Sequence, residues 1–519
     1  MNRGRNFRSD EMIQRMIRRN CAGHLMVLCA LLLYPSWAGA QTSAKPEILV
    51  IDGSAPAHPF PHFWEHMFGS GRASLSMRES YRQDLRSVKQ ITDVGYIRFH
   101  AIFLDDMGVY DEDSAGRPIY NFSYVDQVYD GLLQNGVRPF VELSFMPKKL
   151  ASRDAPHAFW YKQNVAPPKD WSKWDDLIYQ FTKHLVDRYG VDEVEKWYFE
   201  VWNEPNIDFW VGEPKQSTYF ELYDHSVAAV KRVNSRFRVG GPATAQAAWA
   251  DAFIQHCVDK HIPVDFVSTH VYGNDGAQDV FGTNENIPRD RMVCRAVKKV
   301  HDQIKASALP NLPLIWSEFN ASYKNEPEIT DSIYMGPWMA DTIRQCDGLV
   351  NEMSYWTFSD VFEEQGVVKQ PFYGGYGLIA AGGIPKPAFS AVKVLHQLGR
   401  ERLALDSESA LLTRAQDGSL VLAVWNIVTP GQPGAAKSLV LQFKNVGGAH
   451  RASISRVDAA HGDPHPAYEK MGSPIYPTQA QLQELRKSVE LGLPETQEIK
   501  GGQLDLTLPP DGLAVIAIR

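Results

Sequence analysis

The chain has 519 residues, enough for a large hydrophobic core and more than one domain. Apolar residues make up 44% of it and charged residues 22%, which excludes a disordered or fibrous protein. The formal net charge of −8 argues against binding to nucleic acid or to an anionic membrane surface, because both select basic proteins.

Residues 1–40 predict a secretory signal that does not belong to the fold. Several arginines precede the apolar stretch Leu25–Leu33, which is too short to span a membrane, and small residues lead up to Ala40. We expect cleavage after Ala40, export to the periplasm or the medium, and no membrane attachment afterwards. Because the flank before the apolar stretch is long, Met12 and Met16 remain alternative translation starts.

From about residue 60 to 400, apolar strand-like runs alternate with amphipathic helical patterns. Most of the runs are apolar at consecutive positions, as in parallel strands with both faces buried. Eight strand–helix units predict an α/β protein with a closed (β/α)8 TIM barrel. An open doubly wound sheet is the alternative, but no Gly-rich nucleotide fingerprint follows the first run. The predicted strands are 60–67, 96–100, 138–143, 197–202, 237–241, 264–270, 312–317 and 352–357.

Residues 401–519 have a different pattern, with short strands separated by Gly and Pro clusters. This predicts an accessory C-terminal β-sandwich, with strands at 419–425, 438–443 and 504–508. The segment 41–59 contains a further strand-like run at 47–52, which we expect to join the same sandwich.

Three cysteines remain after signal cleavage: Cys257, Cys294 and Cys346. They allow at most one disulfide, and no pair has the spacing of metal ligands. We expect buried free thiols and no metal site formed by them. The composition leaves open whether the chain forms a homo-oligomer.

Two predicted strands end on a carboxylate, Glu204 after the fourth and Glu318 after the seventh. A carboxylate is costly in a dry sheet, so at a strand end it faces either an ion-pair partner or a site. In a (β/α)8 barrel the active site lies at the C-terminal ends of the strands. Two carboxylates there are the minimum equipment for cleaving a glycosidic bond.

Glu204 is followed by Pro205, which is expected to hold it in an extended conformation and to end the strand. Aromatic neighbours should raise the pKa of Glu204, as a proton donor requires. Asn203 beside it could bond a sugar hydroxyl. The alternative is a structural Asn-Glu-Pro turn at the start of a helix.

Arg98, at the end of the second predicted strand, is a candidate partner for Glu318. Its positive charge would favour the ionised form of Glu318, as a nucleophile requires. A purely structural ion pair between Arg98 and Glu318 is the alternative.

Further polar and aromatic residues stand at the same strand ends. His270 is more often a satisfied barrel histidine than a catalytic one, and Trp356 could be either core or a platform beneath a sugar ring. The other strand-end candidates are His100, Glu142, Tyr272, Glu363 and Glu364.

Long segments of the chain resemble glycoside hydrolase family 39, and within it the bacterial β-xylosidases. The matching segments are 69–73, 96–110, 138–147, 197–206, 266–272 and 355–364, and more loosely 471–474. Within the matching motifs, Phe68 and Ala101 depart from what relatives often carry.

The resemblance implies a retaining enzyme that needs no cofactor, with Glu204 as acid/base and Glu318 as nucleophile. It places the following residues where family members hold the sugar: Asn203, His270, Tyr272, Tyr323, Trp356, Glu363 and Glu364. His100 is a reasonable addition, and Arg98 would support the nucleophile.

The resemblance leaves the substrate to be chosen. Glu363 and Glu364 suit neutral hydroxyls and would repel the carboxylate of iduronate, which favours xylose over an α-L-iduronidase activity. We therefore expect an exo-acting β-1,4-xylosidase that acts on xylooligosaccharides in xylan degradation. An exopolysaccharide glycosidase of the same family is a further alternative. A non-catalytic carbohydrate-binding barrel is another, although such proteins usually lose one carboxylate.

Overall fold

A computed structural model describes residues 45–448 and 450–519. The predicted signal, residues 1–40, lies outside the described residues. Among the helices that are described, none combines the length and the apolar character needed to cross a membrane.

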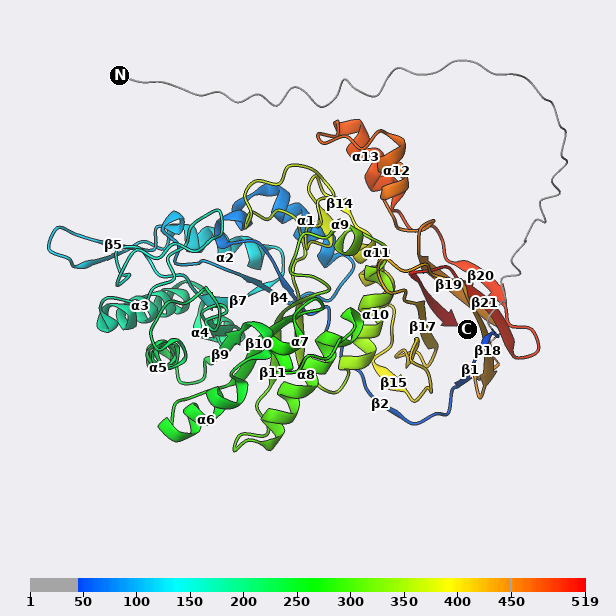
Figure 1. The fold of residues 1–519 in the computed structure, drawn as a ribbon, viewed down its shortest axis with the longest axis horizontal. Helices are drawn as coiled ribbons and strands as arrows, with labels where there is room; N and C mark the ends of the chain where they lie inside the picture. The colour runs from blue at the N-terminus through cyan, green and yellow to red at the C-terminus, as the bar shows by residue number, and fades with distance from the viewer. Residues whose placement is uncertain (1–44, 449) are drawn as a thin grey trace, which may run out of the picture. The chain divides into compact units, whose positions relative to one another are not determined.

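Eight parallel strands close into a barrel in the described part of the chain (Figure 1). They follow one another round the barrel in sequence order, and the last strand pairs with the first. The strands are β3 (Met67–Gly69), β4 (Tyr96–Phe99), β7 (Arg138–Leu143), β8 (Tyr198–Val201), β9 (Arg238–Thr244), β10 (Phe266–Tyr272), β11 (Leu314–Asn320) and β12 (Glu352–Tyr355). The predicted (β/α)8 fold is confirmed, and the open sheet is wrong.

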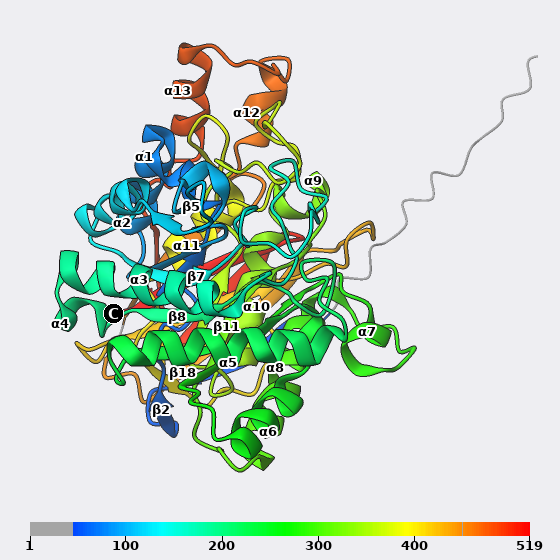
Figure 2. The same cartoon turned by 90° about the vertical axis from the view of Figure 1, so that its left-hand side faces the viewer.

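A helix follows each barrel strand, and α3 and α5 lie side by side on the outside of the barrel (Figure 2). The apolar side of each of these helices is buried. In α3, for example, Trp174, Leu177 and Phe181 are buried while Lys183 and Asp187 are exposed. The helices are α1 (Glu79–Lys89), α2 (Ser123–Gln134), α3 (Trp171–Tyr189), α5 (Lys215–Val233), α6 (Ala250–Lys260), α8 (Arg289–Ala306), α10 (Met335–Cys346) and α11 (Pro387–Leu395). Shorter elements in the connections include β5 (Tyr110–Glu112), β6 (Pro118–Tyr120), α4 (Val191–Val194), α7 (Ala277–Phe281), α9 (Pro327–Thr330), β13 (Ile379–Ala380) and β14 (Ile384–Pro385).

The first predicted strand, 60–67, is misplaced. Its aromatic residues Phe60, Phe63 and Trp64 are buried in the main core, but they form no ladder, and β3 begins only at Met67. Burial of large apolar side chains, which the sequence pattern detects, does not require strand pairing. The other seven predicted strands overlap the observed ones.

The C-terminal part forms two sheets around a separate apolar core, as predicted for a β-sandwich. One sheet consists of β1 (Glu47–Asp52), β18 (Lys437–Lys444) and β21 (Gln503–Leu508). The other consists of β2 (Ala57–Pro59), β15 (Glu401–Leu403), β16 (Ala410–Arg414), β17 (Leu420–Asn426), β22 (Gly512–Ile518), β19 (Arg451–Val457) and β20 (Glu495–Glu498). β1 pairs in parallel with β18.

Two helices between β19 and β20, α12 (His465–Lys470) and α13 (Gln479–Ser488), were not predicted. The signal for α13 was present in the sequence. Thr478 and Gln481 form a capping box, in which each side chain bonds the other residue's backbone N–H.

The prediction of free thiols is wrong for two of the three cysteines. Cys294 on α8 and Cys346 on α10 form a disulfide, since the two helices pack side by side and bring the Cα atoms to 5.1 Å. Their sequence separation of 52 residues gave no hint of this contact. Cys257 is buried and free, as expected.

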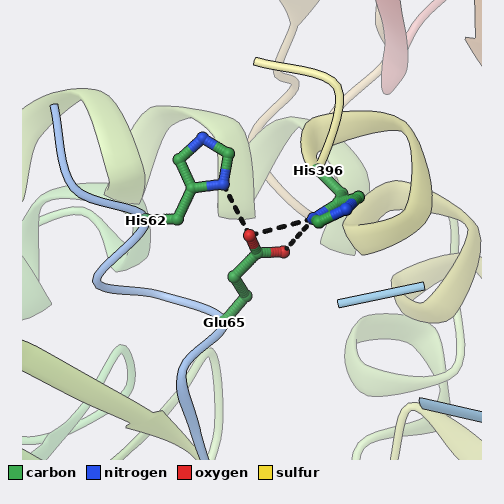
Figure 3. Close-up of side chains that lie close together, drawn as sticks. All are labelled: His62, Glu65 and His396. Atoms are coloured by element: carbon green, nitrogen blue, oxygen red, sulfur yellow. Dashed lines mark hydrogen bonds and ion pairs between the residues drawn. The ribbon is translucent and has the colours of Figure 1, made fainter. Parts of the chain in front are cut away.

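A buried carboxylate connects the segment before β3 to the end of α11 (Figure 3). Glu65 Oε1 lies 2.5 Å from Nδ1 of His62, and Glu65 Oε2 lies 2.9 Å from Nδ1 of His396. His62 Nε2 lies 3.0 Å from the carbonyl of Leu398, so both ring nitrogens of His62 face acceptors. Burial acts to raise the pKa of Glu65, but the two imidazoles outweigh it and lower this pKa.

Replacing Glu65 by glutamine should destabilise the protein by about 3 kcal/mol, because it leaves two imidazoles without their buried counter-charge. Chemical denaturation at pH 6 measures the difference. The difference in unfolding free energy between wild type and variant should shrink as the pH falls through the lowered pKa of Glu65. Protonation of Glu65 in the wild type removes the same negative charge that the glutamine lacks. The matched control is Glu79→Gln, whose carboxylate is exposed and pairs with the exposed Arg86. Equal losses in both variants would show that the cluster contributes no more than a surface ion pair.

Candidate active site

A cavity of about 330 Å³ opens at the C-terminal ends of the barrel strands. Eight of the residues predicted for the site line it: His100, Asn203, Glu204, Tyr272, Glu318, Tyr323, Trp356 and Glu364. Arg98 and His270 are fully buried and contact these residues from within the barrel. Phe68 and Ala101, the two departures from the family pattern, do not line the cavity.

The floor of the site is the guanidinium of Arg98, which binds carboxylates from three other strands. Nε lies 2.6 Å from Glu200, Nη1 lies 2.6 Å from Glu318, and Nη2 lies 2.7 Å from Glu142. Nη2 also donates to Asn203 Oδ1 at 3.0 Å. Burial acts to lower the pKa of Arg98, but the three carboxylates outweigh it and raise this pKa.

Beneath Arg98 the barrel interior is filled by aromatic rings. Phe140, Tyr198 and Phe266 come from three different strands, and their ring centroids lie 5.3 to 5.7 Å apart. Because these rings exclude water from below, the charges above them interact in a medium of low dielectric constant.

Glu318 has hydrogen-bond donors on both carboxylate oxygens. Oε1 accepts from Arg98 Nη1 at 2.6 Å, and Oε2 accepts from the hydroxyl of Tyr272 at 2.7 Å. These two donors fix the direction of the carboxylate. Burial is the main cause that raises the pKa of the Tyr272 hydroxyl, and the charge of Glu318 is the second. Tyr272 therefore keeps its proton and acts as a donor.

Glu204 lies in the opposite electrostatic setting. Its side chain is 12% exposed, and burial raises its pKa well above the usual range, with the charges of Glu318 and Asp275 acting in the same direction. The backbone is not extended as predicted. Glu204 has a φ of 44°, and its N–H donates to the carbonyl of Ala243 at 2.7 Å, so a contact with β9 overrides the preference imposed by Pro205.

The two carboxylates face each other across the cavity. A carboxylate oxygen of Glu204 and one of Glu318 lie within 4.8 Å of each other, with His270 between them. His270 Nδ1 is 3.0 Å from Glu204 Oε1 and 3.6 Å from Glu318 Oε1.

The other predicted residues form the walls. The His100 ring lies against Trp356 with centroids 4.7 Å apart, and its Nδ1 lies 2.7 Å from Glu142. Trp356 can take this position because Gly69 has no side chain, since a Cβ there would lie 2.2 Å from the indole ring. Tyr323 is 45% exposed at the rim.

The two neighbouring glutamates after β12 behave differently. Glu364 lines the cavity, and burial raises its pKa, with the charge of Glu318 next. Glu363 is not among the residues that line the cavity, and its role as a sugar ligand stays a prediction. Its oxygens are bound by Arg72 at 2.9 Å and Arg78 at 2.7 Å, and these arginines lower its pKa against the effect of burial.

Several residues at the site were not singled out in the sequence. Glu200 was detectable in principle, as a carboxylate inside an otherwise apolar strand. Ser317 carries no chemical signal by itself and is recognised only from its contacts with His270 and Glu200. The remaining cavity residues are Phe159, Ile207, Phe209, Ala245, Gln246, Asp275, Gln365 and Tyr376, most of them on loops. Burial raises the pKa of Asp275 to about 6.

Two groups of ligand-type side chains lie within 4.8 Å, a spacing that could suggest a metal ion. They are His62, Glu65 and His396, and Glu204, His270 and Glu318. In both groups a ring nitrogen contacts a carboxylate at 2.5 to 3.0 Å. This is shorter than the spacing of about 3.3 Å between ligands of a tetrahedral zinc ion. Hydrogen bonds therefore account for both groups.

A family model, related sequences and solved structures all match this chain to the same group of proteins. The family model "Glycosyl hydrolases family 39" matches residues 48–497. A β-xylosidase of Geobacillus stearothermophilus is 36% identical over 86% of this chain and 90% of its own. The structure of a GH39 β-xylosidase from Caulobacter crescentus superposes with a TM-score of 0.79 at 34% identity, covering 91% of this chain and all of the other. The α-L-iduronidase of Homo sapiens is 25% identical over only 49% of this chain and 40% of its own.

Replacing Arg98 by lysine should destabilise the protein by about 3 to 5 kcal/mol, because a single ammonium cannot reach three carboxylates on different strands. Urea denaturation at neutral pH measures the change. Arg295→Lys is the matched control. Arg295 pairs with the exposed Glu285, so this variant should lose far less stability than Arg98→Lys. A stable Arg98→Lys variant would mean that the buried carboxylates do not depend on the guanidinium.

Proposed function

The chain belongs to glycosyl hydrolase family 39 and is a glycosidase of the xylosidase type, and we propose that it releases single xylose units from xylooligosaccharides with retention of configuration. The observation that carries the proposal is the pair Glu204 and Glu318. The two carboxylates lie close together in opposite hydrogen-bonding environments.

The first step forms a covalent glycosyl-enzyme. The Glu318 carboxylate attacks the anomeric carbon as the bond to the leaving oxygen breaks, and Glu204 transfers its proton to that oxygen. Arg98 and Tyr272 hold the oxygens of Glu318, which directs the attacking group.

The second step returns the enzyme to its starting state. Glu204, now a carboxylate, takes a proton from a water molecule while the water oxygen attacks the anomeric carbon. The bond from the sugar to Glu318 breaks, and Glu318 leaves as a carboxylate. Inversion at each step gives net retention.

The separation of the carboxylates supports retention. In retaining glycosidases the two carboxyl groups lie about 5 to 5.5 Å apart, whereas inverting enzymes need about 6.5 to 9.5 Å to admit a water molecule between them. Oxygens of Glu204 and Glu318 within 4.8 Å fit the first class.

The charges around the cavity favour a neutral sugar. None of the described residues that line it is a lysine or an arginine, and Glu364 is acidic. The carboxylate of iduronate would enter without a cationic partner, at a cost of several kcal/mol if it remained charged. Arg72 and Arg78 do not change this, because Glu363 binds both.

Two loops that meet beside the cavity support exo action. The backbone N–H of Trp160 donates to the backbone carbonyl of Glu364 at 2.8 Å. Arg72 lies over the rings of Trp160 and Tyr161 at 5.8 and 5.0 Å from their centroids. A wall of this kind next to Glu364 would limit how far a chain extends past the site, as release of single units from a chain end requires.

The N-terminal segment supports export, and we propose cleavage after Ala40 with delivery to the periplasm or the medium. The disulfide Cys294–Cys346 fits this destination, because disulfides persist in oxidising compartments. N-terminal sequencing of the protein recovered from cell fractions tests the proposal. An intact N-terminus on protein found only in the cytoplasm would contradict it.

Glu318→Ala should abolish turnover of aryl β-xylosides, because no covalent intermediate can form. Glu204→Ala should lower kcat/KM by about 10² to 10⁴ for xylobiose and far less for aryl xylosides with activated leaving groups, which need no proton. Added azide should rescue Glu204→Ala and give β-xylosyl azide. Steady-state kinetics and product NMR measure these effects, with Glu285→Gln at the surface as control.

The same kinetics separate the alternatives. Wild-type protein should cleave aryl β-xyloside and leave aryl α-iduronide intact. The reverse preference would indicate an iduronidase, and no turnover of either would favour a non-catalytic binding barrel. Near-native activity of Glu318→Ala would contradict the mechanism.

A further inference from the structure

We propose that Glu200 and Ser317 are positioning residues that keep the catalytic proton on Glu204 by fixing the tautomer of His270. Neither residue touches the cavity, and both act through the imidazole. The inference rests on the proposed function, because it takes Glu204 to be the proton donor.

The direction of each hydrogen bond in this chain is set by Glu200, which accepts at its end. This carboxylate is fully buried and accepts from Arg98 Nε at 2.6 Å on Oε2. Burial raises the pKa of Glu200 above its usual range, and the charge of Arg98 acts against this effect. The direct contact with the guanidinium identifies Glu200 as a hydrogen-bond acceptor and a carboxylate. A carboxylate can only accept hydrogen bonds, so the Ser317 hydroxyl, 2.6 Å from Oε1, must donate its single proton to Glu200.

The direction of that bond determines the tautomer of His270. The imidazole is fully buried, and burial lowers its pKa well below the usual range, with the charges of Arg98 and His100 acting in the same direction. His270 is therefore neutral and carries one N–H. Ser317 has only lone pairs left to offer, so His270 donates from Nε2, which lies 3.0 Å from the Ser317 oxygen.

The tautomer in turn requires a proton on Glu204. With the hydrogen on Nε2, Nδ1 presents a lone pair to Glu204 Oε1 at 3.0 Å. A carboxylate oxygen at that distance would place two lone pairs against each other. A protonated Glu204 instead donates an O–H···N bond to His270, so this arrangement stabilises the acid form of Glu204 over the base form.

The opposite tautomer would weaken the acid. A hydrogen on Nδ1 of His270 would donate to the Glu204 carboxylate and lower its pKa. In the tautomer with the hydrogen on Nε2, the lone pair on Nδ1 also serves the second step. Once Glu204 has lost its proton, the unfavourable contact with Nδ1 increases its tendency to take a proton from water.

Other charged and titratable groups also lie around Glu204, and one of them, Arg98, donates to Glu200 as well. They are Glu318 on β11, Tyr272 on β10, Asp275 in the following loop, Glu364 after β12 and Arg98 on β4. All five remain when Ser317 is replaced. A change in the titration of Glu204 on replacing Ser317 therefore reports the tautomer of His270.

The first test is the pH profile of kcat/KM for an aryl β-xyloside with a poor leaving group. Ser317→Ala removes the acceptor for Nε2–H and lets His270 donate to Glu204. The alkaline limb, which reports loss of the acid proton, should move about one unit to lower pH. The acidic limb should stay in place. Ser317→Thr, which keeps the hydroxyl, should restore the alkaline limb.

The matched control is Ser354→Ala, which removes a buried barrel hydroxyl on β12 outside this chain of contacts. Its profile should match the wild type. Ser317→Cys fills the serine volume with a weak acceptor and should shift the alkaline limb in the same direction as alanine. It replaces Ser317→Ala if circular dichroism shows that the alanine variant is unfolded.

The second test reads the tautomer without turnover. Imidazole ¹⁵N NMR of histidine-labelled protein, with the His270 signals assigned from a His270→Asn variant, should show the Nε2–H form in the wild type and the Nδ1–H form in Ser317→Ala. An active wild type in which Ser317→Ala changes neither the alkaline limb nor the tautomer would overturn the proposal. An inactive wild type that still shows the tautomer change would instead count against the proposed function.

Discussion

The site depends on one buried cation. Arg98 is surrounded by carboxylates from β7, β8 and β11, and no other residue type could serve them together. A guanidinium has five donors in a planar fork, so it can bind three groups in different directions while buried. Without it, several carboxylates would be unpaired above a layer of aromatic rings, where a charge is most costly. The cation is thus needed for stability and for chemistry at once.

Arg98 also explains why two carboxylates of the same chemical type behave differently. Glu318 is in direct contact with the guanidinium, whereas Glu204 is held by a bond to a neutral imidazole. The charge on Glu318 in turn raises the pKa of Glu204. The two roles in the proposed mechanism therefore follow from a single asymmetry in the floor of the barrel. Neither role could be assigned from the composition of the strand ends alone.

Features that depend on a short stretch of sequence could be predicted, whereas features that depend on contacts between residues distant in sequence could not. The barrel follows from repeated buried runs, and Glu204 and Glu318 were found because each ends such a run. Glu363 and Glu364 are adjacent and identical in sequence, yet one is bound by arginines from the loop after β3 and from the start of α1, and the other lines the cavity. The left-handed backbone of Glu204 and the disulfide between α8 and α10 likewise arise from partners distant in sequence.

The wall beside Glu364 shows how such distant contacts determine the substrate. Arg72 binds Glu363 and lies over two aromatic rings of the loop after β7, so a charge that might have attracted an acidic sugar is instead neutralised within the wall. The bond from Trp160 to the carbonyl of Glu364 then fixes the spacing between the two loops. One set of contacts thus forms a wall beside Glu364 and engages Arg72 within that wall. A neutral sugar fits a cavity whose described lining residues include no lysine or arginine.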